Sequence, residues 1–372
     1  MRAHVVREVN VRQTARVMQL SGMFDVPVTK KARLEWNVDM PLDEKPWSVG
    51  LIVGPSGCGK STIARELFPD AYLKGFDWPE DRSVLDAFPA GMSMKDITLL
   101  LSSVGFSSPP SWLRPYGVLS NGEQFRTMIA RALCEFPELC VVDEFTSVVD
   151  RTVAQIGSSA IAKTVRRRGG KFIAVTCHYD VEAWLDPDWI YEPATGKFHW
   201  RSLQGRPAIA LTIYRVHHSE WRLFAPYHYL TAALNPAAKC YVAEYGGRPV
   251  AFHSYLPFFG RLKDKRKAVR GHRSVTLPDF QGVGIAGAMI THLAAAYAGA
   301  GYRVFRNTGH PAEIASARRS ESWRMIRPPS RTGRDTRRTV KHATTRLTAS
   351  FEFCGQPLPE REALRQINQV RH

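Results

Sequence analysis

The sequence contains few cysteines, and they do not occur in the pairs that bind zinc or form redox motifs. Six are scattered among 372 residues, and none belongs to a C-x-x-C pair. Scattered single thiols are typical of a reducing compartment, so we expect a cytoplasmic protein without a disulfide framework. Three of the six lie in apolar stretches and are predicted to be small core residues: Cys134, Cys140 and Cys177.

Long apolar runs are also missing. The first ten residues are charged and contain no apolar signal core. The longest weakly polar run, residues 286–301, contains Thr291 and His292 and is too short to span a bilayer. We therefore expect no membrane segment, and a role in transport would require a separate membrane partner.

Acidic residues are scarce in the C-terminal half. Residues 201–372 hold 10 Asp and Glu against 28 Lys and Arg, whereas residues 1–200 hold 24 against 23. The net charge of +17 therefore comes entirely from the C-terminal half. This asymmetry predicts a polyanionic partner, nucleic acid and in particular DNA. The alternative is a solvated basic surface that only keeps the protein soluble.

A glycine-rich loop follows the first predicted buried strand. Residues 47–53 form this strand, the loop begins at residue 54 with the pattern G-x-x-x-x-G-K-S, and residues 63–68 continue as a helix. In this setting the loop N–H groups surround phosphates, the lysine reaches the β- and γ-phosphates, and the serine hydroxyl holds Mg²⁺. The predicted ATP-binding residues of the loop are Gly54, Gly57, Gly59, Lys60, Ser61 and Thr62.

Two further apolar strands end in residues suited to hydrolysis. Residues 139–142 run into Asp143 and Glu144. Asp143 is predicted to hold Mg²⁺ together with Ser61, and Glu144 to polarise the attacking water. Residues 172–176 are followed by His178, which we predict to sense the γ-phosphate. Glu144 and His178 are thus the candidate catalytic residues.

The order of these motifs resembles that of ABC-type ATPases over residues 45–180. The segment Leu119–Glu123, Leu-Ser-Asn-Gly-Glu, resembles the family's signature, and residues 147–150 resemble its D-loop. The resemblance implies a head-to-tail homodimer in which Ser120 and Gly122 of one copy cover the ATP of the other. Ser120 at a helix N-cap would present a positive helix end to a γ-phosphate, which agrees with that role.

Several positions depart from transport cassettes of this family. Asn121 and Glu123 stand where those cassettes usually have Gly and Gln, and the Glu resembles the soluble ABC ATPases of excision repair. No Gln occurs between the phosphate loop and the signature, so the loop that couples a cassette to a membrane domain is not identifiable. Residues 92–105 are predicted to form a compact helical subdomain. Two aromatic residues are candidates for stacking on adenine: Phe24 and Trp36.

The C-terminal half begins after turn-rich residues 186–207. Strands are predicted at residues 209–215, in a hairpin over 240–255 and at 273–277, and a late strand follows from the alternation of apolar residues over 347–353. Between the strand at 273–277 and an Ala-rich helix lies a turn of the form Q-x-x-G-x-A. Free N–H groups at such a helix start suit a pyrophosphate.

This turn resembles motif A of GNAT-fold acyltransferases, and the resemblance covers residues 209–355. It implies acetyl-CoA or another acyl-CoA as a cofactor; the alternative is a small α/β domain without CoA. The acyl-CoA-binding residues that it implies are Gln281, Gly282, Val283, Gly284, Ile285 and Ala286.

The C-terminal half also contains two clusters of polar and aromatic residues, 224–230 and 308–311. Together they are similar to the phage DNA-modification protein Mom, a GNAT-fold enzyme that acts on adenine in DNA. Two basic stretches, residues 261–273 and 327–346, are typical of phosphate contacts that do not read sequence. The candidates for proton transfer during group transfer are Tyr227, His228, Tyr229, His310 and Glu313.

The sequence thus predicts an α/β protein with a P-loop ABC ATPase domain at residues 1–205, followed by an α+β GNAT-like domain at residues 206–372. The hypothesis is ATP hydrolysis coupled to group transfer on nucleic acid, with DNA modification as the outcome. Two alternatives stay open: an N-acetyltransferase of a protein or small-molecule amine that the ATPase regulates, and a non-catalytic ATP-dependent DNA-binding clamp.

Overall fold

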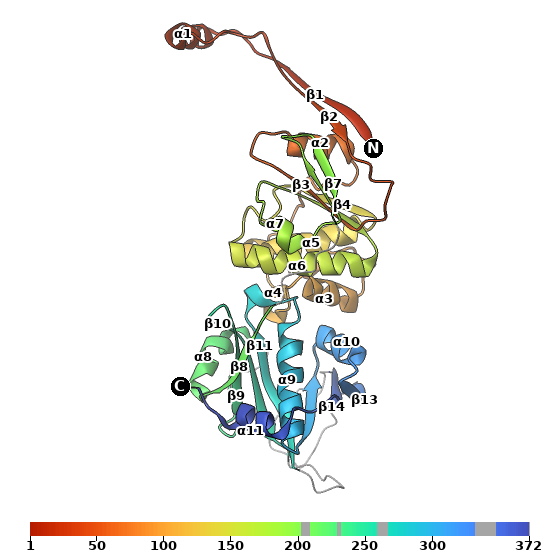
Figure 1. The fold of residues 1–372 in the computed structure, drawn as a ribbon, viewed down its shortest axis with the longest axis vertical. Helices are drawn as coiled ribbons and strands as arrows, with labels where there is room; N and C mark the ends of the chain where they lie inside the picture. Colours follow the sequence, from red (N-terminus) through yellow and green to blue (C-terminus); the bar gives the residue numbers. More distant parts are fainter. Residues whose placement is uncertain (202–208, 229–231, 259–266, 332–346, 372) are drawn as a thin grey trace. The chain divides into compact units, whose positions relative to one another are not determined.

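The computed structural model describes residues 1–201, 209–228, 232–258, 267–331 and 347–371 (Figure 1). Contacts between residues divide the chain into two compact units. Unit 1 consists of Met1–Phe76, Glu135–Val148 and Ala162–Arg206. Unit 2 consists of Asp77–Cys134, Val149–Ile161 and Pro207–His372. The last division, between Arg206 and Pro207, falls one residue from the predicted boundary at 205/206. Two segments of the predicted ATPase domain, Asp77–Cys134 and Val149–Ile161, belong to the same unit as the C-terminal half.

Unit 1 is built on a five-stranded sheet in the order β4-β5-β3-β6-β7. The first four strands of this order are parallel to their neighbours, and β7 is antiparallel to β6. β3 is buried along its whole length, as expected for a parallel strand covered on both faces. The strands predicted at 47–53, 139–142 and 172–176 are confirmed. The five strands are β3 (Val49–Val53), β4 (Leu139–Val142), β5 (Lys171–Thr176), β6 (Trp189–Glu192) and β7 (Lys197–Trp200).

Helices and a long hairpin complete unit 1. The helix predicted after the glycine-rich loop is confirmed as α2 (Lys60–Leu67). Two further helices, α6 (Arg151–Arg168) and α7 (Val181–Leu185), precede and follow β5, and α6 continues into unit 2 at its N-terminal end. The hairpin is formed by the antiparallel strands β1 (Arg2–Asn10) and β2 (Lys31–Asp39), with α1 (Ala15–Phe24) between them. No residue of α1 is buried.

Unit 2 begins with a helical segment, Asp77–Cys134. Met94–Ser103 form α3, which confirms the helical subdomain predicted at 92–105. The longest helix of this segment, α5 (Asn121–Glu135), begins directly after Ser120 and buries seven side chains. The shorter elements are η1 (Val84–Ala87), α4 (Pro109–Trp112) and η2 (Tyr116–Val118).

The rest of unit 2 is a seven-stranded sheet in the order β13-β14-β12-β11-β10-β9-β8. Its neighbouring strands are antiparallel, apart from the parallel pair β11 and β12. This pattern confirms the α+β class of the C-terminal half. The strands are β8 (Thr212–Val216), β9 (Lys239–Tyr245), β10 (Arg248–Pro257), β11 (Ala268–Thr276), β12 (Arg303–Thr308), β13 (Trp323–Arg331) and β14 (Leu347–Phe353).

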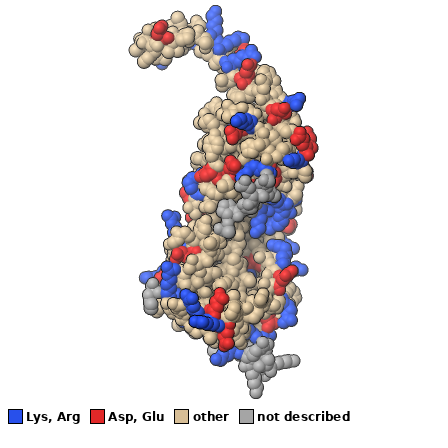
Figure 2. Space-filling model, in the orientation of Figure 1, with Lys and Arg blue, Asp and Glu red and all other residues tan. Residues whose placement is uncertain are grey.

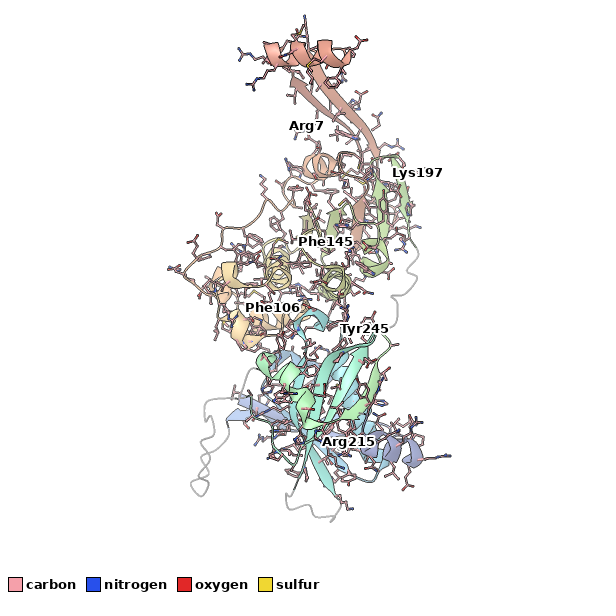
Figure 3. All side chains as sticks on the ribbon, turned by 90° about the vertical axis from the view of Figure 1, so that its left-hand side faces the viewer. Arg7, Phe106, Phe145, Lys197, Arg215 and Tyr245 are labelled. Atoms are coloured by element: carbon pink, nitrogen blue, oxygen red, sulfur yellow. The ribbon has the colours of Figure 1, made fainter. Side chains whose placement is uncertain are left out.

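The helices of this part connect the strands and cover the sheet (Figure 1). The central helix, α9 (Ile285–Gly299), packs into a core cluster with residues of β9, β10, β12 and β14. Figure 3 labels Arg215 and Tyr245 on this sheet and Phe106 on the helical segment. The remaining helices are η3 (His218–Glu220), α8 (Trp221–Phe224), η4 (Ala225–Tyr227), η5 (Pro278–Phe280), α10 (Pro311–Arg319) and α11 (Glu360–Asn368). Of the helices described, none has the length and apolar character needed to cross a membrane.

Candidate functional site

The glycine-rich loop of unit 1 adopts a conformation that depends on its glycines. Gly57 and Gly59 have φ angles of 82° and 96°, a region that side chains rarely adopt. A Cβ atom at Gly59 would lie 2.4 Å from Cε2 of Trp36, so the position also has no room for a side chain. Gly59 is the N-cap of α2 and supplies no side-chain cap, which leaves the first N–H groups of this helix available to an anion.

A cavity lies over the N-terminus of α2 and the carboxyl ends of β4 and β5. It collects residues from four segments of unit 1 that are far apart in the sequence. Lys60 is a buried residue of its lining, and the ammonium group donates to the carbonyl oxygen of Pro55 at 2.7 Å. The lining residues are Leu34, Trp36, Ser56, Gly57, Gly59, Lys60, Ser61, Thr62, Asp143, Glu144, Val175, Thr176 and Cys177.

The acidic pair follows β4 at the edge of this cavity. The hydroxyl of Tyr72 donates to Oδ2 of Asp143 at 2.6 Å, and the Glu144 N–H donates to Oδ1 at 2.9 Å. Both bonds hold the Asp143 carboxylate in one orientation. Burial and the bond to Asp143 raise the pKa of Tyr72, so the phenol stays protonated and keeps donating. The carboxylate of Glu144 is exposed, on a backbone with φ of 52°.

The cavity offers a fitting but incomplete Mg²⁺ site. Ser61 and Asp143 both line it, one hydroxyl and one carboxylate. Within the described part of the chain, no group of three or more His, Cys, Asp or Glu side chains could hold a metal ion. Mg²⁺ is commonly bound by one or two protein oxygens, with phosphates and water as the other ligands. The two residues therefore fit a metal that arrives with a nucleotide.

The segment after β5 differs in part from the prediction. Cys177 is exposed and lines the cavity, so its predicted place in the core is wrong; the β5 strand ends one residue earlier and its side chain emerges at the edge of the sheet. Cys140 is buried, and Cys134 is half-buried. His178 is half-buried, its N–H donates to Oγ1 of Thr176, and it does not line the cavity.

In unit 2, the signature segment forms the start of α5. Ser120 and Glu123 bond each other reciprocally, as in a capping box. The Ser120 N–H donates to Oε2 of Glu123 at 3.0 Å, and the Glu123 N–H donates to Oγ of Ser120 at 3.4 Å. Ser120 and Asn121 remain exposed, so this helix end is open to solvent. Gly122 allows α6 to approach, since a Cβ there would lie 3.3 Å from the Val153 side chain.

The Q-x-x-G-x-A turn lies between β11 and α9. Gly284, with φ of 98°, is the N-cap of α9 and supplies no side-chain cap. Gly284 is exposed. One turn into the helix, a Cβ on Gly287 would have no atom within 4 Å. The N-terminus of α9 is therefore open on this side, as anion binding requires. Ile285 instead points into the core, where it is 3% exposed.

The first two residues of this turn contact the helical segment. The Ser107 N–H donates to Oε1 of Gln281 at 2.7 Å, and Nε2 of Gln281 donates to the Thr276 carbonyl oxygen at 2.9 Å. Gly282 lies against Gly105, where a Cβ on Gly282 would lie 2.6 Å from Cα of Gly105. Of the six residues predicted to bind acyl-CoA, Gln281 and Gly282 thus contact other segments of unit 2.

The strands next to this turn enclose a buried polar group that the sequence did not single out. β11 and β12 pair over only three residues, Ala268–Arg270 with Arg303–Phe305, and then pair no further. His253 of β10 is 3% exposed there, and its ring nitrogens find no hydrogen-bond partner among the described residues. Burial, with Arg306 and His272 adding to it, lowers the pKa of His253 to about 3. Residues 250–255 of β10 are all buried, and nothing in their sequence indicates that the ring nitrogens of His253 lack a hydrogen-bond partner among the described residues.

The structure does not bring the group-transfer candidates together. Tyr227 is exposed at the end of η4, and the ring of His228 lies edge-on to Trp221. His310 is buried before α10, where its ring lies 5.8 Å from that of Trp112. Burial lowers its pKa, which Glu313 and the Ser107 backbone partly offset. Tyr229 lies outside the described residues, as do most positions of the two basic stretches: 261–266 and 332–346.

The described members of the basic stretches make contacts within unit 2. Arg273 donates to the carbonyl oxygen of Ala233 at 3.0 Å, and Arg327 donates to Oγ1 of Thr348 at 3.2 Å. Figure 2 shows Lys and Arg side chains at many places on one face of the protein, with Asp and Glu between them.

The glycine-rich loop, the acidic pair and the parallel sheet define a P-loop ATPase in unit 1. Comparison of the sequence with those of known proteins finds similar ATP-binding proteins of import systems. The chain is 28% identical over 193 residues to the aliphatic sulfonates import ATP-binding protein SsuB 2 of Burkholderia lata, covering 44% of this chain and 70% of that protein. It is 30% identical over 164 residues to the zinc import ATP-binding protein ZnuC of Alcanivorax borkumensis, covering 38% and 62%.

A solved dimeric ATP-binding cassette, in a post-hydrolysis state with ADP and phosphate, is 16% identical, with a TM-score of 0.38 over 54% of this chain and 97% of that chain. The model of the acetyltransferase (GNAT) family matches residues 203–318. The chain therefore carries an ABC ATPase domain in its N-terminal half and a GNAT acetyltransferase domain after it.

Proposed function

We propose that the chain binds and hydrolyses ATP at the cavity of unit 1. The observation that carries this proposal is that Lys60, Ser61, Asp143 and Glu144 line one cavity over an uncapped helix N-terminus. The loop N–H groups and Lys60 bind the phosphates, and Ser61 and Asp143 hold Mg²⁺, which neutralises phosphate charge when bound. Glu144, exposed at the cavity edge, orients the attacking water and accepts its proton.

The N-terminus of α5 serves the ATP of a second copy in this proposal. Ser120 and Asn121 are exposed, and the capping box holds the first turn of α5 in shape. The positive helix end can therefore face a γ-phosphate that another chain holds. A head-to-tail homodimer follows, with two nucleotides at its interface.

The C-terminal domain is proposed to transfer an acyl group from acyl-CoA to an amine. The open N-terminus of α9, from Gly284 onward, is placed to bind the pyrophosphate. In the transfer, the thioester C–S bond breaks and a C–N bond to the acceptor forms. The proton leaves the acceptor nitrogen, and the CoA thiolate takes up a proton. Tyr227, His228 and His310 remain proposals for moving these protons.

We propose nucleic acid, and DNA in particular, as the acceptor. Residues 201–372 carry 28 Lys and Arg against 10 Asp and Glu, which favours a polyanion. The likeness to the phage DNA-modification protein Mom agrees with this acceptor and stays a prediction. A protein or small-molecule amine would be the acceptor if the basic surface served only solubility.

The ATPase proposal is tested with purified full-length chain. Wild-type protein should release phosphate from Mg-ATP. Lys60→Ala should abolish both the binding of ATP and the release of phosphate. Glu144→Gln should bind ATP, hydrolyse it far more slowly, and run as a dimer in light scattering only when ATP is present. A Glu144→Gln chain that stays monomeric at saturating ATP would exclude the head-to-tail dimer.

The acceptor is tested by mass spectrometry of nucleosides from cells that express the wild-type chain or Lys60→Ala. A modified nucleoside that requires an intact ATP site supports nucleic-acid modification. An unmodified nucleoside profile together with acylated protein would instead identify a protein amine as the acceptor. If neither product forms but DNA is bound in the presence of ATP, the non-catalytic clamp is supported.

A further inference from the structure

The loop after α3 and the acyl-CoA turn of unit 2 lie against each other through one glycine on each side, Gly105 and Gly282. We define the acyl-CoA turn as residues 278–284, between β11 and α9. A Cβ on Gly282 would lie 2.6 Å from Cα of Gly105, and a Cβ on Gly105 would lie 2.8 Å from the carbonyl oxygen of Gln281. Both glycines also have positive φ angles, 89° and 96°. The two backbones therefore pass at a distance that only glycine permits on either side.

Gln281 strengthens this junction. Its amide accepts from the Ser107 N–H and donates to the carbonyl oxygen of Thr276, so both of its ends are bonded. A turn that is fixed at the end of β11 and at the loop after α3 cannot shift without breaking one of these bonds. The backbone position of the acyl-CoA turn therefore depends on where the helical segment lies.

Arg126 connects the same turn directly to α5. Its side chain is 1% exposed, and its guanidinium donates to the carbonyl oxygen of Asp279 at 3.2 Å. Its Nε finds no partner among the described residues. Burial lowers the pKa of Arg126, whereas the nearby Asp279, Glu123 and Asp150 carboxylates oppose that change. A buried guanidinium with one carbonyl partner and an unpaired Nε is costly to keep, so its bonding pattern is sensitive to small shifts of the helix.

Arg126 lies in the second turn of α5, close to the capping box that the proposed dimer uses. Ser120 is exposed at the N-terminal end of this helix, and its capping partner Glu123 lies three residues before Arg126. An α-helix is stiff over so short a distance, so a displacement of its N-terminus reaches Arg126. The same helix thus has a surface for a partner's ATP and a buried contact with the acyl-CoA turn.

We propose that Arg126 is a positioning residue for the acyl-CoA turn and that capture of the α5 N-terminus by a partner copy's ATP changes acyl-CoA affinity through it. This inference rests on the proposed functions of both sites. By linkage, ATP and acyl-CoA then change each other's affinity by the same factor. Couplings of this kind are roughly 5-fold to 150-fold.

The test measures binding of acetyl-CoA by titration calorimetry to the full-length Glu144→Gln chain, with and without ATP. We expect ATP to change the Kd of acetyl-CoA at least fivefold in this chain, in line with couplings of roughly that size. In Arg126→Met the two Kd values should converge, and Arg126→Lys, which keeps a charged donor, should restore part of the difference. Arg131→Met is the matched control on the same helix, because Arg131 donates to the carbonyl oxygen of Asp77 and its guanidinium lies over the Trp78 ring.

The outcomes separate the coupling from the proposed function. Acetyl-CoA affinities that do not respond to ATP, or that respond equally in Arg126→Met and Arg131→Met, would overturn the coupling while leaving acyl-CoA binding intact. If acetyl-CoA does not bind under any condition, the acyl-transfer proposal fails, and amide hydrogen exchange over residues 279–288 then decides the coupling. Exchange that changes with ATP in Glu144→Gln supports it, and exchange that stays unchanged overturns it.

If Arg126→Met fails to fold, the same exchange measurement on the Glu144→Gln chain is made without that substitution. It then compares Glu144→Gln with Glu144→Gln combined with Ser120→Asp, which places a negative charge where the γ-phosphate of the partner copy would lie. Loss of the ATP-dependent change in the double variant supports transmission from the α5 N-terminus. An equal change in both chains would contradict it.

Discussion

Removing the indole of Trp36 should weaken ATP binding, because this side chain is placed to form a wall of the nucleotide cavity. Trp36 lines the cavity, and its ring fills the space where a Cβ of Gly59 would lie, 2.4 Å from Cε2. Stacking of a base on an aromatic ring contributes about 1–3 kcal/mol. Trp36→Leu should therefore raise the Kd of ATP by about 5-fold to 150-fold, at 1.4 kcal/mol for each tenfold change.

The chain provides a matched control for this prediction. Phe24 was the other sequence candidate for adenine stacking, but it is 66% exposed at the end of α1, and it is not among the residues that line the cavity. Phe24→Leu should leave the Kd unchanged, and Trp36→Phe should retain most of the affinity. Fluorescence titration with an ATP analogue and Mg²⁺ measures all three. The reasoning is refuted if Trp36→Leu binds as tightly as the wild type, or if Phe24→Leu is affected equally.

Three other substitutions test separate parts of the structure. Ser120→Ala should lower the free energy of unfolding by about 1 kcal/mol, because it removes the capping oxygen of α5. Chemical denaturation followed by tryptophan fluorescence measures this, and an unchanged midpoint would show that the cap does not stabilise the helix. Gly105→Ala should lower the thermal unfolding midpoint of unit 2, because a Cβ would lie 2.8 Å from the Gln281 carbonyl oxygen on a backbone with φ of 96°; an unchanged midpoint would show that the two backbones can separate freely. His253→Gln should reduce acid sensitivity: burial lowers the His253 pKa to about 3 from 6.5, so stability present above pH 6.5 falls as pH drops, by about 2 kcal/mol at pH 5. Denaturation midpoints at pH 7 and 5 measure this, and equal losses in variant and wild type would contradict it.

Much of the nucleotide site could be predicted from the sequence because its chemistry is local. The spacing of the glycines with Lys60 and Ser61 fixes a loop between a strand and a helix, and β3 and α2 occupy those places. Parallel strands of one sheet end at a common edge, so Asp143 and the segment after β5 meet the loop there. Cys177 shows the limit of such reasoning, since an apolar run does not reveal at which residue a strand emerges from the core.

Contacts between distant segments left no comparable signal. Tyr72 follows α2 in an irregular stretch, and nothing in its neighbourhood indicates that its hydroxyl orients Asp143, 71 residues later. His253 lies beside Ser254 in a run of buried residues of β10, 250–255, and nothing in the sequence of that strand distinguishes it. Such residues acquire a role only from the side chains that the fold brings against them.

Glu123 shows how one position can serve two interpretations. The sequence suggested that a Glu in the signature marks the soluble branch of ABC ATPases. In the structure this carboxylate receives both the N–H and the hydroxyl of Ser120, and so completes a capping box that a Gln could also form. The chemistry of the helix N-terminus alone is therefore sufficient to explain why a Glu stands at this position.

The side chain of Gln281 likewise has a local structural role that its sequence pattern does not specify. A Q-x-x-G-x-A pattern specifies a backbone: a strand end, two residues with positive φ, and a helix with an open N-terminus, all of which are present. It does not specify what the first side chain binds. Here Gln281 bonds Ser107, 174 residues earlier, so the side chain that the pattern assigned to a cofactor joins the ATPase part of the chain to the acyl-CoA turn. The N–H groups of α9 beyond Gly284 remain for the cofactor, which places any nucleotide-dependent control at the start of the turn and acyl-CoA binding at its end.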